Sequence, residues 1–194
     1  MKIRFATEED ALSLLEIYNQ YIDTSITFEY VLPSEEEFRG RIREYSKVYP
    51  YFVCEEDEKI IGYIYAHRGM ERAAFQWNAE ISIYLDKNIC GRGLGKKLYA
   101  MIIEVLQLQG VKTVYGSVST PNPRSVKLHE DMGFHFLGAY HNTGFKAGAW
   151  RDLMWFEKQI GEYDEEPVPI KSIYEIDAEL IQNIIDKYEI MEQS

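Results

Sequence analysis

The spacing of apolar residues divides the chain into helical and extended segments. Apolar side chains that recur every three or four residues predict amphipathic helices at 7–22, 34–45 and 94–110. Pro123 and Gly133 bound a further short helix, at 123–131. Runs rich in β-branched and aromatic residues predict strands at 3–5, 51–55, 59–66, 81–85, 111–120, 136–140 and 150–156, with a loop at 143–150 between the last two.

The order of these elements indicates how the sheet is built. The strands 51–55 and 59–66 flank the acidic turn 56–58, which predicts a hairpin. The segment 81–120 contains a strand, a loop, a helix and a strand, so it should be a βαβ unit with parallel strands. These elements predict an α/β (α+β) fold, with one domain over 1–160.

The remainder, 161–194, combines an acidic, proline-containing linker with a helix. Ile176, Ile181, Ile185 and Tyr188 recur at helical spacing in this segment, which predicts an amphipathic helix of about four turns. A helix of that length is marginal in isolation, so it should pack on its own domain or on a partner subunit. We favour packing in a homodimer.

Composition and charge narrow the classes of partner. Acidic residues outnumber basic ones by 32 to 21, and the formal net charge of −11 argues against a nucleic-acid partner. Cys54 and Cys90 lie far apart and suggest neither a disulfide framework nor a metal site. No apolar run approaches a membrane span and the N-terminus lacks the apolar region of a secretion signal. We therefore expect a cytoplasmic protein with no membrane partner.

A glycine-rich loop joins the strand 81–85 to the helix 94–110. Gly91, Gly93 and Gly95 leave alternate positions without side chains, so backbone N–H groups can face a ligand at the positive end of the helix dipole. The spacing fits neither Gly-x4-Gly-Lys-Ser/Thr nor Gly-x-Gly-x-x-Gly. The loop is either a phosphate-binding loop of another kind or an ordinary glycine-rich turn.

Three other features are candidates for chemistry. Glu80 precedes a buried strand, where burial would raise the pKa of a carboxylate and make it a better base; it could also be an edge glutamate in water. Arg68 and Arg72 lie in the linker 67–78, where either could clamp a carboxylate or be a solvated surface residue. The segment 24–30 is either a loop anchored in the core by Phe28 or a lid over an acceptor site.

Two motifs resemble those of the GNAT acyltransferases. Cys90-Gly-Arg-Gly-Leu-Gly95 is similar to the pyrophosphate loop of that family, although Cys90 departs from the usual glutamine or arginine. Asn122-x-x-Ser125-x-x-Leu-His129 is similar to the second signature, with histidine in place of the usual tyrosine. Together with Glu80, the motifs resemble the phosphinothricin and methionine sulfoximine N-acetyltransferases over residues 3 to 160.

The resemblance implies a GNAT fold, with a mixed central sheet, helices on both faces and a βαβ core that binds acetyl-CoA. It also implies transfer of acetyl from acetyl-CoA to the primary amine of a small molecule, and it suggests a homodimer. Acylation of a peptide N-terminus and acyl-CoA binding without turnover are the alternatives.

The resemblance also assigns roles to single residues. Glu80 would be the general base, and His129 the general acid or an organiser of the site. Acetyl-CoA would be held by the residues Ile83, Tyr84, Leu85, Gly91, Arg92, Gly93, Leu94, Gly95, Lys96, Asn122 and Ser125. The acceptor would contact Phe28, Arg72 and Tyr84, and Met70 stands where better-known relatives have a lysine.

Overall fold

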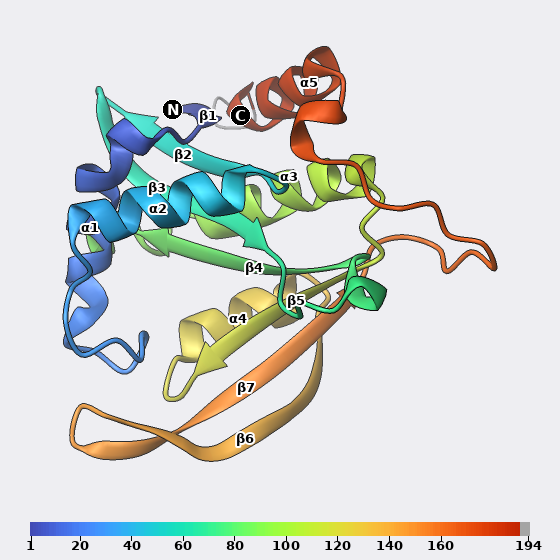
Figure 1. The fold of residues 1–194 in the computed structure, drawn as a ribbon. Helices are drawn as coiled ribbons and strands as arrows, with labels where there is room; N and C mark the ends of the chain where they lie inside the picture. The colour runs from blue at the N-terminus through green and yellow to red at the C-terminus, as the bar shows by residue number, and fades with distance from the viewer. Residues whose placement is uncertain (191–194) are drawn as a thin grey trace.

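The computed structural model describes residues 1–190, which form a seven-stranded sheet with helices on both sides (Figure 1). Across the sheet the order is β1-β2-β3-β4-β5-β7-β6. The strands are β1 (Lys2–Phe5), β2 (Tyr51–Glu56), β3 (Lys59–His67), β4 (Asn78–Leu85), β5 (Thr113–Ser119), β6 (His135–Lys146) and β7 (Ala149–Gln159). Strands β4 and β5 are parallel, as the βαβ unit requires, and the other neighbouring pairs are antiparallel. The predicted mixed sheet is confirmed.

Helices cover both faces of this sheet. On one face, α1 (Ala11–Ile22) and α2 (Glu35–Ser46) bury their apolar sides against β2 and β3. On the other lie α3 (Leu94–Gln109), α4 (Pro123–Asp131) and α5 (Ala178–Ile190). Single 3-10 turns are η1 (Glu8–Asp10), η2 (Ala73–Phe75), η3 (Lys87–Ile89) and η4 (Ile173–Glu175). Within residues 1–190, no helix has both the length and the apolar character needed to cross a bilayer.

The helix boundaries follow local signals in the sequence. The Ser34 side chain accepts a hydrogen bond from the N–H of Glu37 at 3.3 Å, and the Glu37 carboxylate accepts one from the N–H of Ser34 at 2.7 Å. Gly110 ends α3 with a φ of 89°, in the left-handed region that favours glycine. The predicted start near Ser34 and the predicted stop at Gly110 are both confirmed.

The β6–β7 hairpin is longer than the sequence predicts. The expected loop at 143–150 is mostly strand, because the register of the two strands continues out to Lys146 opposite Ala149. Ala147 and Gly148, with φ of 51° and 74°, make the reversal. Residues 140–145 are largely exposed, so they lack the apolar alternation from which a strand is predicted. The hairpin extends past the helices at the bottom of Figure 1.

Strands β4 and β5 are paired over only part of their length. Their register runs from Asn78 opposite Thr113 to Glu80 opposite Tyr115, although β4 continues to Leu85. On its other side, β4 stays paired with β3 as far as Leu85. The sheet therefore opens between β4 and β5 directly after Glu80, and one backbone edge of β4 faces this opening.

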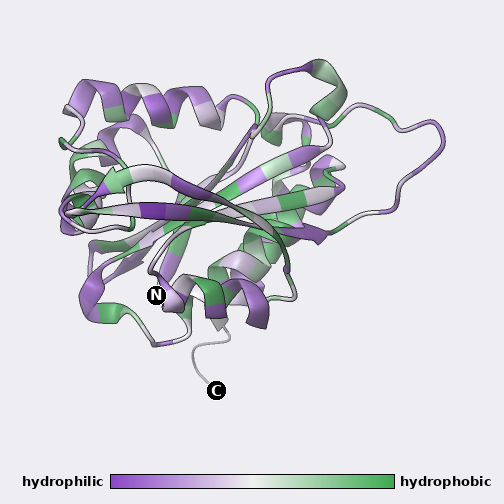
Figure 2. Cartoon of the chain, turned by 90° about the horizontal axis from the view of Figure 1, so that it is seen from below, coloured by the Kyte–Doolittle hydropathy of each residue, from purple (hydrophilic) through white to green (hydrophobic). Residues whose placement is uncertain are grey.

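The segment after β7 returns to the domain. Its linker is mostly hydrophilic in Figure 2, where it forms the extended loop at one side. The indole N–H of Trp77 donates to the carbonyl of Val168 at 2.7 Å and so joins the linker to the start of β4. Helix α5 then buries Ile181, Ile185 and Tyr188 against α3 and β1.

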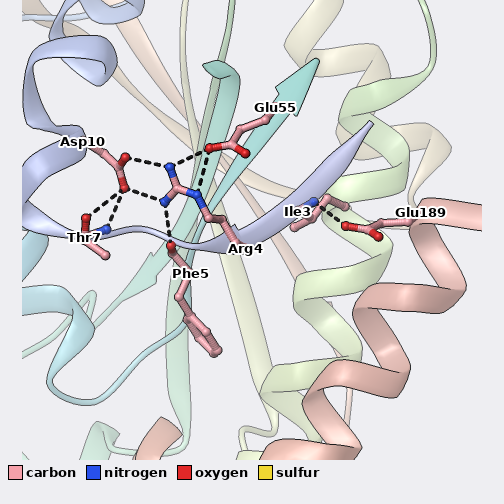
Figure 3. Close-up of polar contacts among 7 residues, drawn as sticks. All are labelled: Ile3, Arg4, Phe5, Thr7, Asp10, Glu55 and Glu189. Atoms are coloured by element: carbon pink, nitrogen blue, oxygen red, sulfur yellow. Dashed lines mark hydrogen bonds and ion pairs between the residues drawn. The ribbon is translucent and has the colours of Figure 1, made fainter. Parts of the chain in front are cut away.

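Polar contacts complete the docking of α5. The Glu189 carboxylate accepts a hydrogen bond from the N–H of Ile3 in β1 (Figure 3), and the carboxylate of Glu104 in α3 accepts one from the Tyr188 hydroxyl at 2.6 Å. Our expectation that this helix packs in a homodimer is wrong, because its apolar face is buried on its own domain. That the protein forms a homodimer, through another surface, stays a prediction.

Strand β1, to which α5 docks, is fixed at the sheet edge by Arg4. The guanidinium donates to both carboxylate oxygens of Asp10 at 2.8 Å and to Glu55 of the neighbouring strand (Figure 3). Bidentate pairs of this kind hold both partners in one orientation. The edge on which α5 rests is thus tied both to η1 and to β2.

Candidate active site

Only alternate residues of β4 direct their backbone N–H and C=O groups into the opening between β4 and β5. Asp86, directly after β4, donates its N–H to the carbonyl of Ile61 in β3 at 2.8 Å. Because successive residues of a strand direct their N–H and C=O groups to opposite sides, the backbone of Ile83 and Leu85 faces the opening. The backbone of Tyr84 faces β3, away from the opening, and its role in holding acetyl-CoA stays a prediction.

The glycine loop begins where β4 ends and leads into α3. Gly91 and Gly93 have φ of 89° and 84°, so their backbone conformation favours glycine. A Cβ at either position would meet no atom within 4 Å, so the space beside the loop is open. Gly93 is the N-cap of α3, and the N–H groups at 94–96 have no acceptor within the helix. N–H groups arranged in this way at a helix N-terminus suit a phosphate or another anion.

The charged side chains of this loop are engaged by neighbouring elements. The Arg92 guanidinium donates to the two carboxylate oxygens of Glu56 at 2.8 and 3.0 Å. The Lys96 ammonium lies 2.8 Å from the Asp131 carboxylate of α4. The groups that the loop offers to an anion are therefore chiefly its backbone amides.

Asn122, Ser125 and His129 are linked by hydrogen bonds at the start of α4. The Asn122 side-chain oxygen accepts a hydrogen bond from the N–H of Ser125 at 3.2 Å. The carbonyl of Ser125 accepts one from Nδ1 of His129 at 2.8 Å, and the Tyr99 hydroxyl lies 3.1 Å from Nε2. A carbonyl can only accept, so Nδ1 carries the proton and Nε2 of the neutral ring accepts from Tyr99. Burial lowers the pKa of His129, which is only 2% exposed, and favours that neutral form.

Glu80 and His129 lie on opposite faces of the sheet. The Ser117 hydroxyl of β5 donates to Oε1 of Glu80 at 2.6 Å. The preceding residue of β5, Gly116, faces His129, and a Cβ there would overlap the imidazole ring. Since successive strand residues point to opposite faces, β5 separates the two side chains. Of the two predicted roles for His129, this geometry favours the organiser of the site over the general acid.

Glu80 lines a pocket of about 560 Å³ beside the opening between β4 and β5. Most of the wall is apolar or aromatic, with side chains from three strands and from the loop after β3. Its larger members are Met70, Tyr115, Leu137, Tyr140 and Trp155. Among the described residues that line the pocket, Glu80 alone is charged. The carboxylate is thus placed to attract a cation whose body is largely apolar.

The three predicted acceptor-site residues lie outside the wall of this pocket. Phe28 is half-buried under the hairpin, where a Cβ on Gly144 would overlap its ring. Tyr84 packs edge-on against Tyr18 with ring centroids 5.0 Å apart, and burial raises the pKa of its hydroxyl. Arg72 is exposed at the N-terminal end of η2. Of the three, Arg72 is the nearest in sequence to a residue of the pocket wall, because it follows Met70 by two positions.

The loop that carries Phe28 is tied to the sheet and the hairpin. The Ser119 hydroxyl donates to the carbonyl of Ser25, and the buried Lys146 ammonium donates to the carbonyl of Glu29. The Tyr30 hydroxyl donates to a further carbonyl in β6. The structure thus shows a fixed loop, held by the hairpin, by β5 and by the core, where the buried Thr27 hydroxyl lies 2.5 Å from the Tyr18 hydroxyl.

Sequence reasoning missed His67, Ser117 and the aromatic wall of the pocket. Ser117 lies two residues beyond the β5 partner of Glu80, so the register of the two strands was the signal that could have identified it. Tyr140 and Trp155 belong to the hairpin, and their position depends on a pairing that local patterns do not specify. Within residues 1–190, no group of three or more His, Cys, Asp or Glu side chains is arranged to hold a metal ion.

The burial of His129 predicts how stability depends on pH. Its pKa is lower in the folded chain than the ordinary value of 6.5, so below that value the unfolded chain binds a proton that the native chain does not. The stabilisation is complete above pH 6.5 and is lost as the pH falls. We therefore expect the free energy of unfolding, measured with urea, to fall less between pH 8 and pH 5 in His129→Gln than in the wild type.

The matched control for this measurement is His135→Gln, which changes an exposed histidine of β6 and should leave the wild-type pH dependence intact. Identical slopes for the wild type and His129→Gln would contradict the prediction, whatever the absolute stability of the variant.

Comparison with known proteins identifies the family. Residues 3–155 match the Acetyltransferase (GNAT) domain. Phosphinothricin N-acetyltransferase of Streptomyces viridochromogenes is 29% identical over 177 residues, which cover 91% of this chain and 96% of that protein. The L-methionine sulfoximine/L-methionine sulfone acetyltransferase of Salmonella typhimurium is 27% identical, over 84% of this chain and 96% of the other.

The fold comparison agrees with the sequence comparison. The GNAT superfamily phosphinothricin acetyltransferase from Sinorhizobium meliloti, solved in complex with acetyl-CoA, matches this structure with a TM-score of 0.82. Its sequence is 31% identical, and the match covers 90% of this chain and 95% of that one. The chain therefore belongs to the GNAT acetyltransferases and is similar to those named for phosphinothricin and methionine sulfoximine.

Proposed function

We propose that this enzyme transfers acetyl from acetyl-CoA directly to the primary amine of a small, amino-acid-like acceptor. The proposal is carried by the Glu80 carboxylate, the one charge among the described residues that line an otherwise apolar and aromatic pocket next to the opening between β4 and β5. The names of the relatives, which refer to phosphinothricin, methionine sulfoximine and methionine sulfone, support the acceptor class.

Backbone groups of this chain would hold acetyl-CoA. The N–H groups at 94–96 suit the pyrophosphate, and the backbone of Ile83 with the N–H of Leu85 suits the amides of pantetheine. The Leu85 carbonyl already accepts a hydrogen bond from the Tyr21 hydroxyl at 2.5 Å. Acetyl-CoA bound in this way supplies a thioester carbonyl that an amine can attack. The glycine loop and the β4 edge orient the donor beside Glu80.

Glu80 would act as the general base. An ammonium group has no lone pair, so one proton must leave before the nitrogen can attack a carbonyl carbon. The Ser117 hydroxyl occupies Oε1 of Glu80 and fixes the carboxylate, which leaves Oε2 to accept that proton. His129, bonded at both ring nitrogens, would hold α4 against α3 and β5.

Two measurements test this function. Calorimetry should detect binding when acetyl-CoA is titrated into the folded protein, and thiol release from acetyl-CoA should depend on an added amine. The panel of amines compares methionine sulfoximine and phosphinothricin with polyamines and short peptides. Release with peptides alone would move the acceptor to a peptide N-terminus, binding without any release would indicate a non-catalytic module, and no binding would contradict the proposal.

Arg72 would bind the carboxylate of an amino-acid acceptor from the rim of the pocket. Because a charge-assisted pair contributes about 1.5–3 kcal/mol, Arg72→Ala should raise the KM for such acceptors about tenfold or more. The KM for acetyl-CoA and for amines without a carboxylate should stay unchanged in steady-state assays.

Arg68→Ala is the matched control, since Arg68 is exposed on the same loop and donates to the carbonyl of Glu71. An equal rise in KM for amines with and without a carboxylate would show that Arg72 is not a carboxylate clamp.

A further inference from the structure

His67 is a histidine next to Glu80 that the proposed chemistry does not yet use. It is the last residue of β3 and lies directly opposite Glu80 in the register of β3 and β4. Its Nε2 is 3.9 Å from Oε2 of Glu80, the carboxylate oxygen that Ser117 leaves open. The Glu80 side chain is 12% exposed and the His67 side chain 20% exposed, so the ring has the greater access to solvent of the two.

The hydrogen bond at Nδ1 of His67 determines whether Nε2, the ring nitrogen nearer to Glu80, carries a proton or a lone pair. Nδ1 lies 3.2 Å from the carbonyl oxygen of Arg68. A carbonyl accepts but never donates, so this bond requires the proton on Nδ1. In the neutral ring, Nε2 is then unprotonated and can accept a proton from the side of Glu80.

Neighbouring aromatic rings fix the orientation of the imidazole. The His67 ring stacks on Tyr45 of α2 with centroids 5.1 Å apart and planes 26° apart, and it packs at a tilt against Tyr65 of β3 at 5.8 Å. The titratable groups beside the ring are Glu80 from β4, Tyr45 from α2 and Tyr65 from β3, while Arg68 contributes its backbone carbonyl and directs its guanidinium to the carbonyl of Glu71. Of these, Glu80 is the carboxylate toward which Nε2 points.

The stoichiometry of acetyl transfer requires an exit for one proton. The acceptor enters as an ammonium and leaves as an amide, so the nitrogen loses two protons as its lone pair bonds to the acetyl carbon and the C–S bond breaks. One proton ends on the sulfur of CoA, and the other must reach the solvent. Glu80 regains its carboxylate form only when it passes that proton on.

The geometry assigns His67 the role of proton relay: it takes from Glu80 the proton that the ammonium has lost and releases it to the solvent. This inference rests on the proposed acetyl transfer, and it adds the path by which the base is regenerated. A small rotation of either side chain would shorten the 3.9 Å between Nε2 and Oε2 to hydrogen-bond reach.

His67→Phe tests the relay, because phenylalanine keeps the stacking on Tyr45 and Tyr65 but cannot carry a proton. Since positioned acid–base groups contribute ~100-fold or more and Glu80 itself is retained, we expect kcat at pH 7 in dilute buffer to fall about tenfold. Added imidazole should restore much of this loss in a concentration-dependent manner, while wild-type kcat should not respond to imidazole.

The matched control is His141→Phe on the exposed part of β6, which should resemble the wild type in both respects. If His67→Phe matches the wild type in kcat and imidazole response, the relay is overturned. A loss that imidazole does not restore would make the ring a purely structural support and would also overturn it. In either case, an active wild type leaves the proposed acetyl transfer intact.

An independent measurement does not require turnover. The long-range ¹H–¹⁵N NMR spectrum of the neutral His67 ring should show the proton on Nδ1. A proton on Nε2 would overturn the relay, because the ring would then present a donor and not a lone pair to Glu80. If the wild type released no thiol with any amine, the proposed acetyl transfer would be contradicted. The relay would then have no proton to carry.

Discussion

Replacing Glu80 by glutamine is expected to lower kcat for acetyl transfer by roughly 100- to 1,000-fold near neutral pH, which is within the range of a positioned general base. The glutamine amide keeps the size of the side chain and can still accept the Ser117 hydrogen bond that holds Oε1 at 2.6 Å. It cannot take a proton from an ammonium. The change should therefore appear in thiol-release assays as a loss of kcat with little effect on acetyl-CoA affinity in calorimetry.

The control for this variant is Glu179→Gln, which changes an exposed carboxylate on α5 far from the pocket. It should leave kcat unchanged. If Glu80→Gln retained the wild-type rate near neutral pH, another group would have to be the base, and the assignment of the pocket to the acceptor would lose its main support.

Removing residues 171–194 is expected to destabilise the domain by several kcal/mol. The tail buries Ile173, Ile181, Ile185 and Tyr188, and each large apolar side chain contributes about 1.5–3 kcal/mol when fully buried. Because domains are stable by only about 5–15 kcal/mol, the shortened chain should be partly unfolded at 25 °C or unfold at much lower urea concentrations. Urea titration followed by circular dichroism measures the change.

Two point variants test whether the loss of stability comes from the lost packing of α5 or only from the shorter chain. Ile185→Asp places a charge in the buried face of α5 and should reproduce much of the loss. Leu180→Lys changes the exposed side of the same helix and should be nearly neutral. A shortened chain as stable as the full one would show that the contacts of α5 with α3 and β1 contribute little.

Local backbone signals explain what could be predicted of the site. Gly91 and Gly93 adopt a positive φ, which glycine favours more than other residues do. Helix α3 then begins at Leu94, as the spacing of its apolar residues predicts. The Asn122 side chain caps α4 by accepting a hydrogen bond from the N–H of Ser125, three residues later in the chain. The motifs by which the chain resembles the GNAT family consist of such features, because each is encoded within a few residues.

The remaining features depend on contacts between distant segments. The position of Ser117 beside Glu80 requires the register of two parallel strands, and the opening between them requires that this pairing stop after Glu80. The apolar positions of α5 predicted that it is buried but not against which surface. Helical spacing specifies the width of a buried face, and the partner is selected by the whole fold.

The contact between Gly116 and His129 has a consequence for how this enzyme can diversify. The imidazole occupies the space that any larger residue at position 116 would need. Descendants that acquire a side chain at 116 must therefore shrink or reorient residue 129 in the same lineage. In an alignment of close homologues these two positions should change together, as an evolutionary trace of one steric exclusion between β5 and α4.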